Sequence, residues 1–331
     1  MNYIIFDLEW NQSPRGKEQS ISGVPFEIIE FGAIRLNEKR KETGRFHAFV
    51  KPKLYKELHF VTKQIVHVTS KELEAKGRPF PEVMKEFLDF CGEDFTFCTW
   101  GTSDLTELQK NMNYYNMSNI HPLFQKPIYY YDIQKLFSIQ FEDGKERKTL
   151  QAAIEFFPLK ESMEFHSALN DAAYTAAVFK KLHFEKVHAF YSIDTYRIPE
   201  KGEEIYANFG TYEKYISHGF TNRDTILSDR NVSAVECFLC PTHRRLRKKL
   251  HWFSSNGKTY HSVGICPVHG LIKSKLRIKQ TDDGLYYVIK TTKRTNEEKL
   301  AELRARQKHV QEKKRLKRLK ESKNSKNPDA T

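Results

Sequence analysis

The sequence predicts a mixed α/β sheet flanked by helices, followed by a small β-rich module and a basic C-terminal helix. Over residues 1–183, strand-like segments first form a meander and then alternate with helical segments, which is typical of a mixed sheet covered by helices. Beyond residue 231, two Cys-x-x-Cys/His pairs frame a hairpin signal. Charge divides the chain at the same place: residues 231–331 hold 25 Lys and Arg against 9 Asp and Glu, whereas residues 1–230 hold 30 and 33.

The elements of the first part follow from hydrophobic spacing. Runs rich in Ile, Phe and Tyr predict strands, and apolar residues three and four positions apart predict helices. Thr102 or Ser103 would cap one helix, and Thr149 another. We expect strands over 2–8, 27–36, 44–51, 94–100 and 128–131, and helices over 81–90, 104–112, 149–157 and 167–182.

The rest of the chain divides into three segments. We expect residues 184–230 to be a partly helical linker, 231–294 a zinc-ribbon-like module, and 295–331 a basic helix that ends in a disordered tail. Asn256-Gly257 and the 282–284 stretch are the turn signals of two hairpins in the module.

Composition points to a soluble, folded protein. The 24 Phe, 16 Tyr and 3 Trp residues supply a core, and no apolar run in the sequence is long enough to cross a bilayer. The chain enters its first predicted strand close behind Met1, without a secretory signal. We therefore expect a cytoplasmic protein that does not engage membranes and whose five cysteines are reduced thiols.

Asp7 and Glu9 end the first predicted strand. Residues two apart point to the same face of a strand, so the two carboxylates project together and repel each other unless protons or cations neutralise them. Because hard divalent cations take oxygen ligands, the pair is a candidate Mg²⁺ or Mn²⁺ site. The alternative is a solvated strand end.

Three further residues could take part in the same chemistry. Asp104 follows the 94–100 strand at the start of a helix, and His166 precedes Asp171 at the head of another. Each has a plain structural alternative when taken alone: a helix cap, a packing histidine, and an acid favoured by the helix dipole.

In this order and context the five residues resemble the active-site set of the DEDDh-type 3′→5′ exonucleases. That family has a ribonuclease-H-like fold and includes RNase T, the proofreading subunits of bacterial replicases and the histone-mRNA-type exoribonucleases. The resemblance covers residues 2–183, and the 27–36 and 66–69 segments resemble lesser family signatures. It implies a metal-dependent hydrolase that releases nucleoside 5′-monophosphates from 3′ ends.

The resemblance also implies a role for each residue. Two Mg²⁺ or Mn²⁺ ions about 3.5–4 Å apart would activate water and stabilise charge on the phosphate. Asp7 would bridge both ions, and Glu9 and Asp171 would hold the ion that activates water. Asp104 would serve the second ion. His166, whose imidazole titrates near neutral pH, would deprotonate the water.

Trp10 departs from the family pattern, in which Thr or Ser often follows the acid pair. The backbone there approaches the terminal nucleotide in the family, so Trp10 would stack on or wedge against the 3′-terminal base, an interaction worth about 1–3 kcal/mol. The alternative is a ring packed over the end of the sheet.

The C-terminal pairs are Cys237 with Cys240 and Cys266 with His269, with 25 residues between the pairs. Their spacing predicts one tetrahedral Zn²⁺ held by three thiolates and one imidazole. His243 or His261 could replace the fourth ligand, and the alternative is a set of unlinked cysteines and histidines.

Basic residues surround these pairs, interleaved with aromatic rings. Cations would neutralise phosphates while rings stack on bases; the alternative is a solvated charged face. The candidate nucleic-acid-binding residues of the module are Arg244, Arg245, Arg247, Lys248, Lys249, Trp252, Lys273, Lys275 and Arg277.

Together these features predict a 3′→5′ exonuclease whose zinc module grips single-stranded RNA or DNA. RNA is slightly favoured, because the closest-looking stretches resemble the exoribonuclease branch. Two other functions stay open: a DNA proofreading or repair exonuclease, and a catalytically inactive nucleic-acid-binding adaptor on the same fold.

Overall fold

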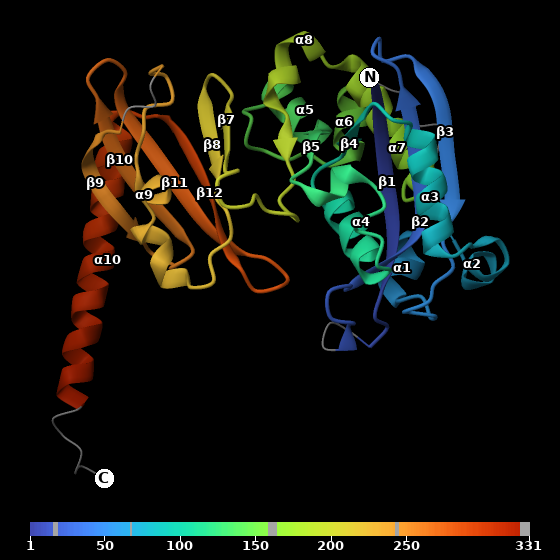
Figure 1. Cartoon of the computed structure of the whole chain (residues 1–331), viewed down its shortest axis with the longest axis horizontal. Coiled ribbons are helices and arrows are strands. Elements are labelled where there is room, and N and C mark those ends of the chain that lie inside the picture. Colours follow the sequence, from blue (N-terminus) through green and yellow to red (C-terminus); the bar gives the residue numbers. More distant parts are fainter. Residues whose placement is uncertain (16–18, 67, 158–163, 242–244, 325–331) are drawn as a thin grey trace. The chain divides into compact units, whose positions relative to one another are not determined.

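The chain folds into two compact units, Met1–Arg197 and Ile198–Thr331, each built on one six-stranded sheet (Figure 1). The structure is a computed structural model that describes residues 1–15, 19–66, 68–157, 164–241 and 245–324, with side chains up to residue 317. Within this part of the chain, no helix combines the length and apolar character that crossing a bilayer requires.

The first unit contains the predicted mixed sheet. An antiparallel meander of three strands is extended by two strands parallel to the first, and a short antiparallel strand closes the edge. The strands, in spatial order, are β3 (Glu42–Phe49), β2 (Phe26–Leu36), β1 (Asn2–Gln12), β4 (Phe95–Thr99), β5 (Tyr129–Asp132) and β6 (Ser192–Ile193).

Helices cover both faces of this sheet. The predicted helices are present, and three further helices, α1, α2 and α5, were not foreseen. The helices are α1 (Phe60–Ile65), α2 (Ser70–Lys76), α3 (Phe80–Cys91), α4 (Ser103–Tyr114), α5 (Ile133–Phe141), α6 (Leu150–Phe156), α7 (Ala168–Lys181) and α8 (Phe184–Val187), with 3-10 turns η2 (Pro122–Gln125) and η3 (His188–Phe190).

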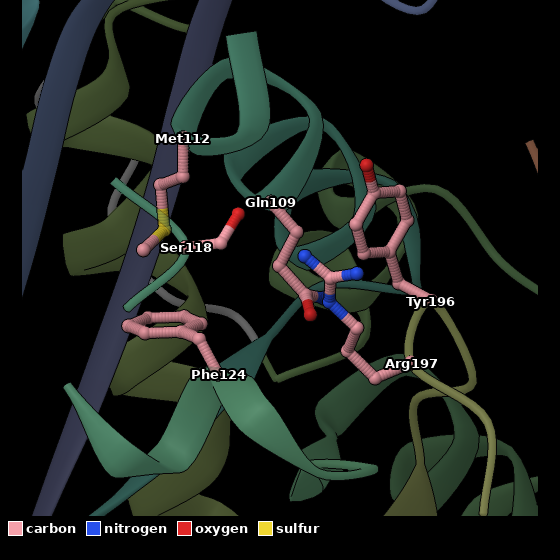
Figure 2. A pocket seen from close by; sticks show the side chains of 6 residues that line it. All are labelled: Gln109, Met112, Ser118, Phe124, Tyr196 and Arg197. Atoms are coloured by element: carbon pink, nitrogen blue, oxygen red, sulfur yellow. The ribbon is translucent and has the colours of Figure 1, made fainter. Parts of the chain in front are cut away.

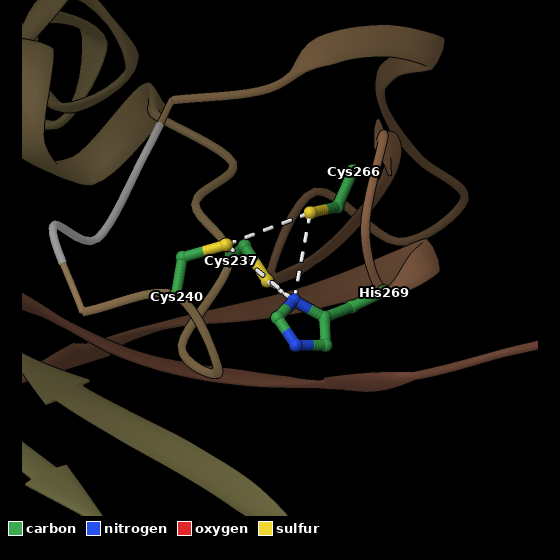
Figure 3. A group of neighbouring side chains, drawn as sticks. All are labelled: Cys237, Cys240, Cys266 and His269. Atoms are coloured by element: carbon green, nitrogen blue, oxygen red, sulfur yellow. Dashed lines mark hydrogen bonds between the residues drawn. The ribbon is translucent and has the colours of Figure 1, made fainter.

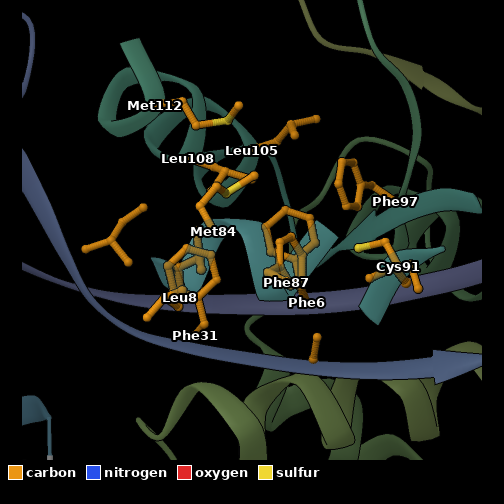
Figure 4. Packing of buried hydrophobic residues seen from close by; sticks show 14 of the residues in the cluster. Phe6, Leu8, Phe31, Met84, Phe87, Cys91, Phe97, Leu105, Leu108 and Met112 are labelled. Carbon is orange, nitrogen blue, oxygen red and sulfur yellow. The ribbon is translucent and has the colours of Figure 1, made fainter. Parts of the chain in front are cut away.

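Strand β1 divides its side chains between two cores. Phe6 and Leu8 pack with the residues of α3 and α4, where Phe87 and Leu108 are fully buried (Figure 4). The intervening residues, such as Ile5, pack against α5, α6 and α7 on the opposite face. The acids at positions 7 and 9 therefore lie on the α7 face, because side chains alternate along a strand.

The end of the first unit is tied to α4. The side-chain amide of Gln109 donates to Leu105 O (3.0 Å) and to Asp194 Oδ1 (2.8 Å), and the backbone N–H of Tyr196 donates to the same carboxylate oxygen (3.0 Å). These bonds lie beside a small hollow under Tyr196 and Arg197 (Figure 2). The first unit thus extends beyond the expected boundary at residue 183.

The second unit is a fully antiparallel sheet with a long C-terminal helix. Both predicted hairpins are present. The strands, in spatial order, are β7 (Ile205–Asn208), β8 (Tyr212–Ile216), β12 (Tyr286–Arg294), β11 (Gly270–Gln280), β10 (Thr259–Cys266) and β9 (Arg247–Ser254), accompanied by η4 (Arg223–Ser228), α9 (Arg230–Ser233) and α10 (Glu297–Asn324).

The segment 184–230 is not a separate linker. It contributes β6 to the first sheet, and β7 and β8 to the second, because its apolar and aromatic residues pair with neighbouring strands. Helix α10 packs on one face of the second sheet through Leu300 and Leu303, and its remaining turns run past the sheet (Figure 1). Residues 325–331, the end of the expected tail, lie outside the described residues.

Candidate active site and metal cluster

Asp7 and Glu9 lie side by side in β1, which continues to Gln12 and does not end at the acids as expected. In the β1–β2 register Asp7 is opposite Gly32 and Glu9 is opposite Glu30, and a β-bulge follows directly after Glu9. Bulges re-aim side chains and are common next to active sites. Strand β1 thus presents two carboxylates on the α7 face, beyond a fully apolar core segment.

Asp104 joins the pair from the first turn of α4. The loop before this helix turns at Gly101, whose φ of 98° is costly for other residues, and the Thr99 hydroxyl donates to Gly101 O (2.8 Å). The backbone N–H of Leu8 donates to Asp104 Oδ1 (3.2 Å), a direct link between α4 and the residue that separates the two acids. Asp104 is 5% exposed.

His166 and Asp171 come from the start of α7. The backbone N–H of His166 donates to Asp171 Oδ2 (3.2 Å), and His166 adopts the left-handed backbone conformation at φ 64°. A Cβ atom at position 32 would lie 2.1 Å from backbone atoms of Ala168 and Leu169, so Gly32 permits α7 to begin against β2. This contact brings the helix start to the acids of β1.

The structure brings all five residues into one cluster. One ligand atom each from Glu9, His166 and Asp171 lie within 4.8 Å of one another. Asp7 and Asp104 belong to the same group. The charges of Asp104 and Glu9 raise the pKa of Asp7, and the charge of Asp171 raises the pKa of both Asp7 and Asp104. The imidazole of His166 is exposed, whereas Asp171 is 9% exposed.

Burial and mutual repulsion raise the pKa of every carboxyl in the cluster. Burial, Asp104 and Glu9 hold the pKa of Asp7 well above its usual value. Burial followed by repulsion from Asp171 and Glu30 raises the pKa of Glu9 to about 8. Burial raises the pKa of Asp104 to about 7 and that of Asp171 to about 6, although backbone N–H donors oppose both shifts. Full ionisation of the cluster therefore requires a compensating positive charge.

The cluster fits divalent cations. Asp171 Oδ1 is buried and accepts no hydrogen bond from the residues that the structure describes, so a buried acceptor is left for a cation. Four carboxylates and one imidazole form a hard, oxygen-rich donor set, which suits Mg²⁺ or Mn²⁺.

One further residue of the site, Glu30, was not singled out from the sequence. Glu30 is 3% exposed, stands opposite Glu9 and accepts hydrogen bonds from His47 Nε2 (2.9 Å) and Ser167 Oγ (3.1 Å). In the sequence Glu30 is a polar residue within the apolar 27–36 segment, which was noted only as a whole, as a lesser family signature.

Trp10 lies on the other face of the sheet. Its ring packs against the core that contains Leu8 and contacts Phe26, with ring centroids 5.8 Å apart. The alternation that places the two acids on the α7 face directs the next residue away from them. This geometry favours the packing role over the expected contact with a terminal base. Of the 66–69 signature, Thr69 caps α2, and His67 lies outside the described residues.

The Cys₃His cluster of the second unit has tetrahedral dimensions (Figure 3). The Nδ1 atom of His269 is 3.4 Å from the sulfurs of Cys237 and Cys240 and 3.7 Å from that of Cys266, and the sulfurs of Cys240 and Cys266 are 3.6 Å apart. Zn–S bonds of about 2.3 Å give tetrahedral edges of roughly 3.7 Å. The four side chains therefore fit one Zn²⁺.

The thiol chemistry agrees with this fit. Although burial acts in the opposite direction, backbone N–H donors of His269 and Val268 lower the pKa of Cys266 to about 6, which favours the thiolate. The alternative ligand His261 is on another face, beside Phe253, where burial and nearby Lys273 lower its pKa to about 4. His243 lies outside the described residues.

The candidate nucleic-acid-binding residues do not form one surface. Trp252 is partly buried and packs against the core around Tyr215, and its indole N–H donates to Ser233 O (2.8 Å), which favours a packing role. Arg245 is 3.5 Å from Glu236, and Arg244 lies outside the described residues. Arg247 pairs with Ile265 and Lys248 with Gly264, which places these neighbours on opposite faces, and Lys249 lies in the bulge between them and Leu250.

One face of the second sheet gathers the remaining cations. Lys273, Lys275 and Arg277 alternate along β11 and share the face on which α10 packs. Lys273 stands directly opposite Lys293 of β12. Burial lowers the pKa of both lysines, and repulsion from neighbouring cations adds to this effect. The strongest repulsion comes from Lys293 for Lys273 and from Arg277 for Lys275. A like-charge pair opposed across two strands is destabilising, so this face would gain from a bound polyanion.

Comparisons with known proteins identify the family to which the first unit is similar. The family model described as "RNase_T: Exonuclease" matches residues 4–179. Similar solved structures include a full-length 3′-exonuclease (18% identity, TM-score 0.47, 56% of this chain and 82% of that chain). A second is a 3′-exonuclease in 3′-end-specific recognition of a histone mRNA stem-loop (18% identity, TM-score 0.46, 54% of this chain and 80% of that chain). A third is E. coli exonuclease I in complex with an oligonucleotide (12% identity, TM-score 0.43, 80% of this chain and 55% of that chain). No curated protein matched the sequence.

Proposed function

Because the chain belongs to the RNase_T family of DEDDh-type 3′→5′ exonucleases, we propose that it removes nucleotides from the 3′ ends of single-stranded nucleic acid, with RNA favoured over DNA. The observation that carries the proposal is the meeting of four carboxylates and the exposed His166 at one end of β1. The preference for RNA rests on sequence resemblance alone.

Each residue of the cluster has a task in this reaction. Asp7, Glu9 and Asp171 would hold the divalent ions on the α7 face, and Asp104 would add its carboxylate from α4. When bound, the ions supply the charge that activates water and stabilises the departing oxygen. The exposed imidazole of His166 would take the proton of the attacking water at a ring nitrogen, which is the task of a general base.

The second unit would hold the substrate strand away from the chemistry. One Zn²⁺ bound by Cys237, Cys240, Cys266 and His269 would fix the two knuckles. The phosphates would lie on the basic face of β11, where Lys273, Lys275 and Arg277 gather. Arg247 and Lys249 stay candidates for the same task, whereas the partly buried ring of Trp252, packed against the core around Tyr215, is better suited to a structural role.

The deciding experiment compares matched RNA and DNA oligomers of one sequence in single turnover with Mn²⁺. We expect stepwise loss of nucleoside 5′-monophosphates from the 3′ end, faster for RNA, and none with Asp7→Asn. Equal or faster cleavage of DNA would favour a proofreading or repair enzyme. If the wild type releases no nucleotide and binds oligomers as the variant does, the adaptor function is correct.

A further inference from the structure

Glu30 is a buried acid whose place in the site has no chemical task so far. It lies in β2 opposite Glu9, and its charge contributes to the raised pKa of Glu9 and Asp171. A carboxylate that is 3% exposed and adds repulsion to an acidic site is costly unless its hydrogen bonds serve the fold or the function.

Two donors meet one oxygen of this carboxylate. His47 Nε2 lies 2.9 Å from Glu30 Oε1, and Ser167 Oγ donates to the same oxygen at 3.1 Å. His47 belongs to β3, so the carboxylate is fixed from the sheet side and reaches across to the start of α7.

The side chain of Ser167 donates to Glu30 and does not cap its own helix. It is the N-cap residue of α7, yet its side chain makes no hydrogen bond to the helix N–H groups. A serine at this position normally accepts such a bond, which stabilises the helix. Here the hydroxyl is directed to Glu30 instead, and it ties the helix start to β2.

The residue held by this tie is His166. Its left-handed backbone, at φ 64°, is unfavourable for a residue with a side chain. Such a conformation persists only when both sides are fixed. The His166 N–H is fixed by Asp171, and the following residue, Ser167, is fixed by Glu30.

We propose that Glu30 is a positioning residue that accepts the Ser167 hydroxyl and so sets the place of the general base His166. The proposal rests on the proposed function of His166. It gives Glu30 no contact with metal or substrate: the carboxylate acts through Ser167, and His47 holds it in orientation.

The test separates an acceptor from a metal ligand. Glu30→Met keeps the length of the side chain but cannot accept, whereas Glu30→Gln keeps an accepting oxygen and loses the charge. Ser167→Ala removes the donor, and Thr149→Ala is the matched control, since Thr149 caps α6 by accepting from Ala152 N (3.2 Å). We compare kcat, KM, thermal midpoint, and Mn²⁺ affinity by calorimetry.

Glu30→Met and Ser167→Ala should each lower kcat by about 10- to 100-fold with KM and Mn²⁺ affinity nearly unchanged, the loss that a small misplacement of a catalytic group produces. The double variant should lose no more than either single one. Glu30→Gln and Thr149→Ala should stay near wild type in kcat. If Glu30→Gln is as inactive as Glu30→Met and binds Mn²⁺ far more weakly, Glu30 is a metal ligand and the proposal is wrong.

A second readout does not depend on activity. Amide hydrogen exchange in residues 164–171 should be faster in Glu30→Met and Ser167→Ala, and unchanged in Thr149→Ala. Unchanged exchange in all variants, or a wild-type kcat in Ser167→Ala, would overturn the positioning role. Failure of the wild type to release nucleotides would instead refute the proposed function, and the exchange data would still decide whether Glu30 holds this turn.

Discussion

Replacing Asp171 by asparagine should stabilise the metal-free protein while abolishing its activity. The carboxyl has a pKa of 3.8 in an unconstrained chain and about 6 in the fold, chiefly because of burial. Between these values the folded state binds more protons than the unfolded state, so the free energy of unfolding falls as pH rises through this window. A shift of this size corresponds to roughly 3 kcal/mol once the group is ionised in both states.

Asparagine does not ionise, and its side-chain oxygen can still accept the His166 N–H. Asp171→Asn should therefore raise the free energy of unfolding by up to roughly 3 kcal/mol at about pH 8, and hardly change it at about pH 4. For a unit of this size that is a rise in thermal midpoint of about 6–12 °C. Added Mn²⁺ should reverse the order, because only the wild type keeps the full set of ligands.

The assay is thermal unfolding followed by circular dichroism at both pH values. The protein is exchanged into metal-free buffer without chelator, so that a zinc ion held by the Cys₃His cluster would be retained. Asp89→Asn, on the exposed side of α3, is the matched control and should follow the wild type at both pH values. A midpoint of Asp171→Asn equal to or below that of the wild type at the higher pH would refute the account of the acidic cluster.

Three other outcomes follow from the structure. Trp10→Ala should cost about 2–3 kcal/mol of stability through lost packing, and should leave KM for short oligonucleotides unchanged; a raised KM would restore the stacking role. Metal analysis should find one zinc per chain and almost none in Cys237→Ser, whose second unit should lose its cooperative melting; zinc retained at the wild-type level would exclude this cluster as the site. In an Asp7→Asn background, Lys273→Gln combined with Lys275→Gln should weaken oligonucleotide binding. The slope of the logarithm of the binding constant against the logarithm of the salt concentration should become shallower by about 0.7 per lost phosphate contact. Arg245→Gln is the control and should leave binding unchanged.

The fold of the first unit could be predicted from sequence because its strands and helices are strongly periodic. The apolar runs of β1 and β2, and the helical spacing of α3 and α7, left little ambiguity. The second sheet was underestimated: β7 and β8 are short, and β8 joins the sheet through β12, which lies about 70 residues further on, so nothing local marks this pair of strands as part of that sheet.

The candidate site shows the same contrast. Asp7 and Glu9 were visible because their spacing alone places them together on one face. Glu30 was not, because its function depends on Ser167, far along the chain, and on a hydrogen bond that only the folded structure creates. Trp252 looked like a base-stacking residue among basic neighbours, but burial of the ring is decided by the packing of β9 against distant residues.

The placement of the acids in sequence also affects when this protein can become a nuclease at all. The cluster draws on β1, on α4 and on α7, so its members extend from residue 7 to residue 171. The strand that carries the first two acids is the same one that holds both cores of the unit together. A nascent chain cannot assemble the cluster until α7 has left the ribosome, and a chain without β1 lacks the strand that joins both cores and two of the candidate catalytic acids at once. The acid cluster and the folded unit therefore form together.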